Sequence, residues 1–280
     1  MKAMKLEEFR KILTETGEYR SDPARLPERS GKSRWNTIRY CWDCGSVFPK
    51  VAVYEGCRIL DTDKWAHFCF HSITGAERMG VPVHVDGWNV LKNVEGPVMF
   101  LSNHMSTVET VMLPALILTY KPFNVVVKES LTRLPFLKKA AAHMGLVPIG
   151  RKSPKQDLID MMRISTERIV EQRNSFLIFP QGTRSKVFRR AKFSSIGAKI
   201  AERAGCPIVP IAVDTRIMPT REGKGWMDKT FKDFGTVDPA FDLKCSCGPI
   251  IPCGKAKDMH EATFDWIANK LEEWGCPTER

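Results

Sequence analysis

The stretch GPVMFLSNHMSTVET, Gly96–Thr110, decides the fold, because it passes from a buried strand into a helix within a few residues. Its apolar run, residues 97–101, is typical of a strand buried on both faces. The run ends in a serine and an asparagine followed by His104, and Glu109 follows five residues after the histidine. The sequence therefore places an ionisable base and an acid between the end of a strand and the start of a helix.

Outward from this stretch, apolar strands alternate with amphipathic helices from about residue 81. Such alternation predicts an α/β fold with a mostly parallel, mixed sheet covered by helices on both faces, preceded by an N-terminal helical segment. The expected strands are VPVHVDG (81–87), PVMFLS (97–102), NVVVK (124–128), LVPIG (146–150), SFLIFP (175–180) and PIVPIAV (207–213). The expected helices cover residues 108–118, 136–144, 156–173 and 194–204. Ligands of such sheets bind beyond the carboxyl ends of the strands.

The pattern divides the chain into three parts. Residues 1–80 form an N-terminal region, charged and expected to be partly frayed up to residue 30, then aromatic-rich and helical. Residues 81–255 form the main domain, and residues 256–280 a C-terminal amphipathic helix packed on it. The helical stripes that support this division are Trp65, Phe68, Cys69 and Ile73, and Phe264, Ile267, Leu271 and Trp274. The first stripe either packs on the main domain or touches lipid.

The net charge of the 280 residues is +11, which favours anionic partners such as lipid, phosphate or coenzyme A. Residues 121–155 hold eight Lys or Arg and one acid, and residues 184–192 hold five basic residues and no acid. A solvated basic surface would give the same runs. The composition, 43% hydrophobic and 27% charged, excludes a disordered chain.

The longest apolar run, VMLPALIL, is much shorter than the roughly 18–20 residues of a membrane-spanning helix, so no transmembrane helix is expected. The N-terminus is charged throughout and shows no secretory signal. We expect reduced thiols among the nine cysteines and a cytoplasmic protein. Cys41 and Cys44 have the spacing of half a zinc site or a redox pair, but Cys245, Cys247 and Cys253 lack the spacing of a zinc knuckle, which favours thiols packed as small apolar side chains.

His104 is a candidate general base, because a histidine beyond a strand end titrates near neutral pH. Glu109 is a candidate for fixing its tautomer and stabilising the imidazolium. The local pattern leaves a second interpretation open. Ser106 and Glu109 have the spacing of a capping box, in which the glutamate accepts a hydrogen bond from the serine backbone and starts the helix.

Three further motifs follow strand ends or form strands. FPQGTRS (179–185) combines Gly182, where backbone N–H groups approach a ligand, with Arg184, whose planar fork suits phosphate. A tight turn with a surface arginine is the alternative. GLVPIGR (145–151) is a strand ending in glycine and Arg151, and IVPIAV (208–213) is a buried strand that resembles any core strand.

In their order and spacing, these motifs resemble those of the glycerolipid acyltransferases typified by 1-acylglycerol-3-phosphate acyltransferase. That family shows N-H-x-x-x-x-D, G-x-x-x-x-x-R, F-P-E-G-T-R-S and V-P-x-x-x, and this chain has NHMSTVE, GLVPIGR, FPQGTRS and IVPIAV over about residues 85–215. The resemblance favours the catalytic interpretation of Glu109. The chain departs from the family at Glu109, where the motif has aspartate, and at Gln181, where it has glutamate; the second departure affects the identity of the acceptor.

The resemblance implies transfer of a fatty acyl group from acyl-CoA or acyl-carrier protein to the hydroxyl of a lysophospholipid such as 1-acylglycerol 3-phosphate, in phospholipid biosynthesis. His104 and Glu109 are then catalytic, and the candidate substrate-binding residues are Lys128, Arg151, Gln181, Gly182, Thr183 and Arg184. No metal and no bound cofactor are needed. The partners would include an anionic membrane surface, with the protein peripheral on the inner membrane face and residues 35–80 as the docking surface.

Rival functions come from other classes. A non-catalytic lipid- or phosphate-binding protein that retains the fold is the main alternative, and Gln181 is its support. A serine hydrolase would need a G-x-S-x-G elbow, which the sequence lacks. A nucleic-acid binder is favoured by charge alone and lacks aromatic-interleaved basic motifs, so no nucleic-acid partner is expected.

Overall fold

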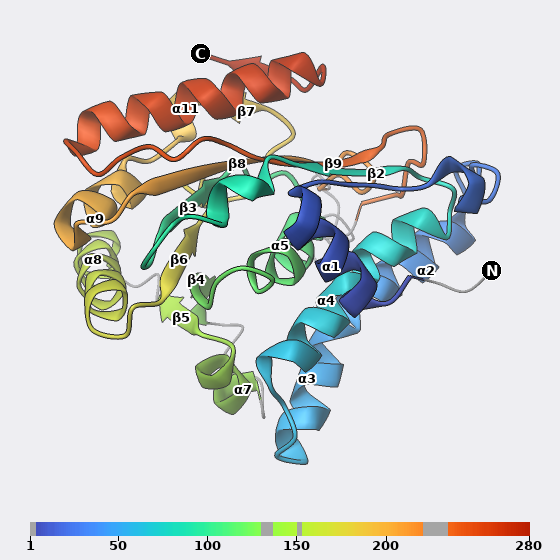
Figure 1. Cartoon of the computed structure of the whole chain (residues 1–280), viewed down its shortest axis with the longest axis horizontal. Helices are drawn as coiled ribbons and strands as arrows, with labels where there is room; N and C mark the ends of the chain where they lie inside the picture. Colours follow the sequence, from blue (N-terminus) through green and yellow to red (C-terminus); the bar gives the residue numbers. More distant parts are fainter. Residues whose placement is uncertain (1–3, 130–136, 150–152, 221–234) are drawn as a thin grey trace.

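A computed structural model describes residues 4–129, 137–149, 153–220 and 235–280, and within them the predicted strands pair into one sheet of eight strands. The α/β fold expected from the sequence is confirmed (Figure 1). In sheet order the strands are β1 (Tyr19–Arg20), β2 (Val83–Asp86), β9 (Leu243–Cys247), β8 (Ile208–Asp214), β3 (Met99–Ser102), β6 (Ser175–Ile178), β4 (Phe123–Lys128) and β5 (Leu146–Ile149).

Five neighbouring strands, β8, β3, β6, β4 and β5, run parallel. The stretch that decides the fold forms β3, which pairs with β8 and β6 inside this group and has all four of its residues buried. The other half of the sheet is mixed, because β9 is antiparallel to β8 and parallel to β2, while β1 is antiparallel to β2. The carboxyl ends of the five parallel strands therefore meet at one edge.

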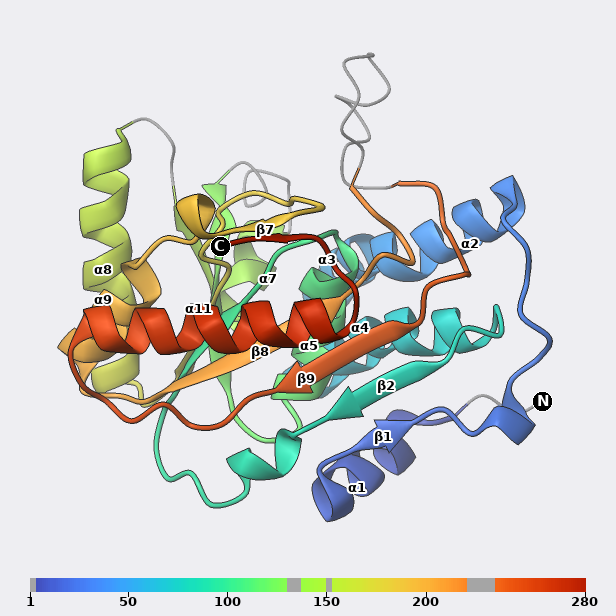
Figure 2. The ribbon, with the colours of Figure 1, turned by 90° about the horizontal axis from the view of Figure 1, so that it is seen from above.

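Helices cover both faces of the sheet (Figures 1 and 2). On one face, α9 packs against α8 and α11; on the other, α5 packs against α4. Residues 108–117 of α5 are apolar nearly all round and buried almost throughout, because the helix lies between the sheet and α4. The helices are α1 (Leu6–Thr16), α2 (Arg34–Gly45), α3 (Val47–Gly56), α4 (Thr62–Glu77), α5 (Val108–Ile117), α7 (Leu137–His143), α8 (Pro154–Val170), α9 (Ile196–Ala204) and α11 (Ala256–Glu273).

The N-terminal segment is more ordered than expected. Leu6, Phe9 and Leu13 recur at helical spacing, so α1 presents an apolar face, and Phe9 and Leu13 are completely buried. The chain then turns at Gly17 and pairs as β1 with the edge of the sheet. For residues 6–16 the expectation of fraying was wrong, because the charges lie on the outer face of a packed helix.

The stripe on α4 packs into the protein and does not face outward. Trp65, Phe68, Cys69 and Ile73 are at most 6% exposed and belong to the same core cluster as α5 and β2. Of the two interpretations left open by the sequence, packing on the main domain holds for these residues. Residues 1–80 thus share a hydrophobic core with the sheet.

The C-terminal helix, α11, packs against β8 and α9. Phe264, Ile267 and Leu271 are buried, whereas Trp274 lies just beyond the helix end. Two features here were not predicted from the sequence. The chain ends in a short strand, β10 (Thr278–Glu279), which pairs in parallel with β7 (Phe188–Arg189). Strand β9, where Cys245 and Cys247 are buried, was also not expected.

Burial raises the pKa of the Cys44 thiol well above its usual value, as it does for Cys245. These side chains are packed as neutral thiols. Within the described ranges, no three His, Cys, Asp or Glu side chains converge as a metal ion would require. None of the helices in the described part of the chain combines the length and apolar content needed to cross a bilayer.

Candidate active site

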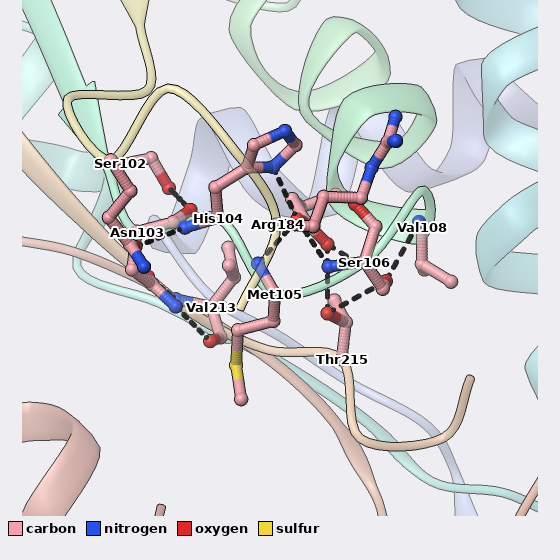
Figure 3. A network of polar contacts seen from close by, with 11 residues as sticks. Ser102, Asn103, His104, Met105, Ser106, Val108, Arg184, Val213 and Thr215 are labelled. Carbon is pink, nitrogen blue, oxygen red and sulfur yellow. Dashed lines mark hydrogen bonds and ion pairs between the residues drawn. The ribbon is translucent and has the colours of Figure 1, made fainter. Parts of the chain in front are cut away.

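Three neighbouring parallel strands deliver the site residues to one edge of the sheet (Figure 3). His104 lies two residues after β3, Gln181 three residues after β6, and Thr215 directly after β8. The edge is where the carboxyl ends of parallel strands leave a crevice for ligands. Segments more than 100 residues apart in sequence, such as those of Glu109 and Thr215, are therefore in direct contact.

His104 and Glu109 form a hydrogen-bonded pair, with 2.8 Å between the imidazole Nδ1 and the carboxylate Oε1. The Glu109 side chain is completely buried, and that of His104 is 12% exposed. An ionised carboxylate only accepts, so Nδ1 carries the proton and donates. The second ring nitrogen, Nε2, is on the other side of the ring and has its lone pair available to accept a proton.

Glu109 is also the helix cap that the alternative interpretation predicts. Its Oε1 accepts hydrogen bonds from the backbone N–H groups of Met105 and Ser106, each at 2.7 Å. The Ser106 hydroxyl in turn accepts from the backbone N–H of Val108 at the start of α5. The two interpretations are compatible, because one carboxylate oxygen serves both the helix start and the histidine.

The charge of Glu109 is maintained although the group is buried. Burial acts to raise the pKa of this carboxyl, but the hydrogen bond from His104, the charge of His104 and the backbone hydrogen bond from Ser106 outweigh it. The net effect lowers the pKa below its usual 4.5. Glu109 is therefore ionised at neutral pH, which is the state that orients an imidazole and stabilises an imidazolium.

The strand-end loop that carries His104 is attached to β8 by Asn103, a residue that had not been predicted to have a role of its own. Asn103 is completely buried, its Nδ2 donates to the Val213 carbonyl at 2.9 Å, and its Oδ1 accepts from the Val213 N–H at 2.8 Å. The side-chain amide thus pairs with β8 as a backbone peptide would. The signal in the sequence was its place as the first residue of the NHMSTVE motif.

The FPQGTRS loop is hydrogen-bonded to both backbone groups of His104. Gln181 accepts from the His104 N–H through its side-chain Oε1 at 2.7 Å, and the Ser185 N–H donates to the His104 carbonyl at 2.9 Å. Phe179 stacks on the imidazole, with 4.3 Å between ring centroids and 22° between planes. The loop therefore fixes where the histidine lies.

Gln181 has a contact that the sequence did not predict. Its side-chain carbonyl oxygen accepts the hydrogen bond from the His104 backbone. The contact between Gln181 and the acceptor stays a prediction, and the amide nitrogen is the atom that would make it. A carboxylate, as in the family pattern, would offer the same accepting oxygen. The departure from glutamate thus preserves the contact that holds His104.

Arg184 lies beside the histidine. Its Nε donates to the Ser106 carbonyl at 3.0 Å, and its guanidinium extends to the same side of the loop as the imidazole (Figure 3). Gly182 has a backbone φ of +66°, which favours glycine, and its N–H donates to the Phe179 carbonyl in the turn. Thr183 follows in the turn and is exposed.

The two remaining predicted residues follow neighbouring strands. Lys128 is the last residue of β4, at the same edge of the sheet, but its side chain lies outside the described residues. Arg151 also lies outside them, two residues after β5. Of the predicted residues, the structure thus brings together His104, Glu109, Gln181 and Arg184.

This arrangement has the parts needed to activate a hydroxyl group next to an anion. The imidazole Nε2 can accept a proton, the buried carboxylate stabilises the resulting imidazolium, and the guanidinium suits a phosphate. The serine nucleophile of a catalytic triad is not among the partners of His104 in the described part of the chain. Such a pair fits direct attack by a substrate hydroxyl.

Comparison with known proteins shows similarity to acyltransferases. Residues 82–214 match the family model described as Acyltransferase. The chain is 37% identical over 123 residues to a 1-acyl-sn-glycerol-3-phosphate acyltransferase of Pseudomonas aeruginosa, covering 44% of this chain and 46% of the relative. It is 32% identical over 138 residues to a chloroplastic 1-acyl-sn-glycerol-3-phosphate acyltransferase of Brassica napus, covering 49% and 39%.

These matches span less than half the length of either relative. The crystal structure of PlsC, the 1-acyl-sn-glycerophosphate acyltransferase from Thermotoga maritima, superposes with a TM-score of 0.55 at 15% identity, covering 85% of this chain and 95% of that chain. The structural likeness extends the common fold beyond the matched segment. The segment that contains the motifs, residues 82–214, is thus similar in sequence to the glycerolipid acyltransferases.

Proposed function

We propose that the protein transfers a fatty acyl group from a thioester to the hydroxyl of a lysophospholipid, as a step of phospholipid biosynthesis. The observation that carries the proposal is the 2.8 Å hydrogen bond from His104 to the buried, ionised Glu109, at the edge of the sheet where Arg184 also lies. A base and a cation side by side suit a substrate that carries both a hydroxyl and a phosphate.

The reaction follows from this geometry. His104 Nε2 takes the proton from the acceptor hydroxyl as its oxygen attacks the thioester carbonyl carbon. The resulting tetrahedral oxyanion collapses, the carbon–sulfur bond breaks, and the imidazolium returns the proton to the leaving thiolate. Glu109 stabilises the imidazolium between these two steps. A thioester is already activated, so no acyl-enzyme intermediate and no metal are required.

The acceptor is proposed to be a lysophospholipid such as 1-acylglycerol 3-phosphate, the class that the names of the relatives specify. Arg184 would bind its phosphate, and Lys128 and Arg151, which stand at and just after the ends of β4 and β5 in the sequence, would add positive charge. The turn of Gly182 and Thr183, with the Gln181 amide, would line the headgroup. The donor is acyl-CoA or acyl-carrier protein, and the net charge of +11 suits the anionic character of both.

We also propose that the protein works at a membrane surface, peripheral on the cytoplasmic side of the inner membrane, with part of residues 1–80 in contact with lipid. Trp35, Ile38 and Trp42 lie along one face of α2 at helical spacing and are 71%, 61% and 68% exposed. Arg34 and Arg39 are also on this helix and exposed. An exposed face of this composition fits the interface of an anionic bilayer.

The direct test is release of free thiol from acyl-CoA, or from acyl-carrier protein, with lysophosphatidate and other lyso-lipids as acceptors. We expect turnover in the wild type and a 10²–10⁴-fold lower kcat in His104→Ala, about 3–5 kcal/mol in the barrier. His84→Ala, at a partly exposed histidine on β2, serves as the control. An inert wild type across all donors and acceptors would favour the non-catalytic binding protein instead.

A further inference from the structure

The second carboxylate oxygen of Glu109, the one that does not contact His104, is held by two hydroxyl groups. Oε2 accepts from the Thr215 Oγ1 at 2.8 Å and from the Ser106 Oγ at 3.0 Å, and the two hydroxyl oxygens are 3.0 Å apart (Figure 3). All three side chains are completely buried. The carboxylate is thus enclosed in a closed polar network that water does not reach.

The protons in this network can be assigned. Each hydroxyl has one proton. Ser106 donates either to Glu109 directly or to the Thr215 oxygen, since both acceptors are in range. The 2.8 Å hydrogen bond gives the Thr215 proton to Glu109 Oε2. Thr215 is therefore a donor to the carboxylate from a neighbouring strand.

Thr215 is itself held in a fixed position. The residue before it, Asp214, is 1% exposed and forms a two-point ion pair with Arg216, at 2.9 Å to Nε and 2.7 Å to NH2. Arg216 then donates to the backbone carbonyls of Trp274 and Gly275, in the segment after α11. The residues on either side of Thr215 are thus held by an ion pair with each other and by hydrogen bonds to the segment after α11.

From this geometry we propose that Thr215 is a positioning residue, which orients the Glu109 carboxylate so that Oε1 remains on His104 Nδ1. The inference rests on the proposed function for its effect on rate, but the hydrogen bond that it concerns exists without substrate. A buried carboxylate that loses the donor from a neighbouring strand is held less tightly about its Cγ–Cδ bond, because its remaining donors all come from residues 104–106. The histidine would then lose the orientation that aims Nε2 at the acceptor hydroxyl.

The test compares Thr215→Val, which removes the hydroxyl at nearly constant volume, with Thr215→Ser, which retains it. Thr263→Val is the matched control: Thr263 is equally buried, on α11, and donates to the Met259 carbonyl. We expect kcat to fall about tenfold or more in Thr215→Val, with a much smaller change in KM, because hydrogen bonds to charged groups are among the strong ones. Thr215→Ser and Thr263→Val should stay within about threefold of wild type.

The second readout needs no substrate. In proton NMR at low temperature, the His104 Nδ1–H should give a downfield signal that is protected from exchange, assigned by its absence in His104→Ala. We expect the signal to broaden or vanish in Thr215→Val and to persist in Thr215→Ser and Thr263→Val. A Thr215→Val protein with wild-type kcat and an unchanged signal would overturn the inference.

The two hypotheses fail in different ways. If the wild type shows no acyl transfer with any donor, the proposed function fails, and the NMR comparison alone decides whether Thr215 orients the pair. If the wild type is active and Thr215→Val loses only thermal stability, with kcat and the signal retained, the proposed function stands and Thr215 is structural.

Discussion

Glu109 is one methylene longer than the aspartate of the family motif, and the structure shows what the extra length reaches. Its Oε1 contacts His104 while Oε2 contacts Thr215 on another strand. An aspartate keeps the charge but spans less of this network, and a glutamine keeps the length but loses the charge. The negative charge at position 109 matters more for stabilising the His104 imidazolium than the complete set of hydrogen bonds to the carboxylate.

We therefore expect Glu109→Asp to retain more activity than Glu109→Gln, which should lose about a hundredfold or more in kcat. The free energy of unfolding of Glu109→Gln should also fall, by about 2 kcal/mol at pH 7, since a buried carboxylate and its donors are disturbed. Steady-state kinetics and urea unfolding measure the two effects. Full activity in Glu109→Gln with altered stability alone would make Glu109 only a helix cap.

The same residue predicts a pH dependence of stability. Because its pKa is lowered in the folded state, the ionised form contributes stability that is fully present above the unfolded value of about 4.5 and is lost as the pH falls through the folded pKa. The difference in melting temperature between wild type and Glu109→Gln should narrow as the pH drops below about 4.5. A constant difference from pH 7 to pH 3 would contradict a lowered pKa.

Arg184 allows a prediction on the acceptor. We expect Arg184→Ala to raise KM for a phosphate-bearing acceptor more than KM for the acyl donor, and Arg184→Lys to restore binding only in part, because lysine lacks the planar fork. Arg189→Ala, at a partly exposed arginine paired with Glu279, is the control. A change confined to the donor KM would assign Arg184 to the thioester carrier.

At the level of single residues, the sequence identified the residues that carry charge at the site and missed those that hold them. His104, Glu109 and Arg184 stand in motifs with recognisable order. The Asn103 side chain makes a hydrogen bond to the backbone of β8, and the Thr215 side chain makes one to the Glu109 carboxylate. Which strands are neighbours is a property of the folded sheet, so a local pattern does not reveal such partners.

At the level of elements, the strands and helices between residues 81 and 214, apart from the short strand β7, lie where the sequence predicted them, because most have an apolar run or a clear helical period. The missed strands have two to five residues: β1, β7, β9 and β10. Two residues, as in β1, β7 and β10, are too few to show alternation, and the LKCSC run of β9 has no long apolar stretch. Their pairing depends on the edges that the longer strands expose.

The first helix supplies a prediction on stability. Phe9 is completely buried and its ring packs against Tyr19 and Phe70, at 4.8 Å and 4.9 Å between centroids. We expect Phe9→Ala to lower the free energy of unfolding by about 3–5 kcal/mol, as for other buried phenylalanines. Ile12→Ala, on the less buried side of the helix, should have a smaller effect in the same urea titration. Equal, small losses would mean that α1 is not part of the cooperative core.

At the level of the whole molecule, the exposed face of α2 and the charge of +11 predict how the protein meets a lipid surface. We expect the Trp35→Ser/Trp42→Ser double variant to bind vesicles containing anionic lipid about tenfold or more weakly in cosedimentation, since partial burial of an indole is worth on the order of 1 kcal/mol or more. Added salt should weaken wild-type binding further.

The matched control is Val170→Ser, an apolar side chain on α8 that is 55% exposed, which should leave binding unchanged. Activity on an acceptor too short to form micelles should also be unaffected by the α2 substitutions. Equal loss of vesicle binding in the Val170 variant would mean that any exposed apolar side chain contributes to binding, and not those of α2 in particular. Undiminished binding in the double variant would remove α2 from the interface.

The attachment of residues 181–185 to His104 bears on how this enzyme can diversify. Because Gln181 and Ser185 hold the His104 backbone and Arg184 holds that of Ser106, the loop proposed to bind the acceptor's phosphate also fixes the position of His104, the proposed base. Grafting this loop alone from a relative with another acceptor would displace the base. A change of specificity is therefore expected to need exchange of residues 103–109 together with residues 179–185.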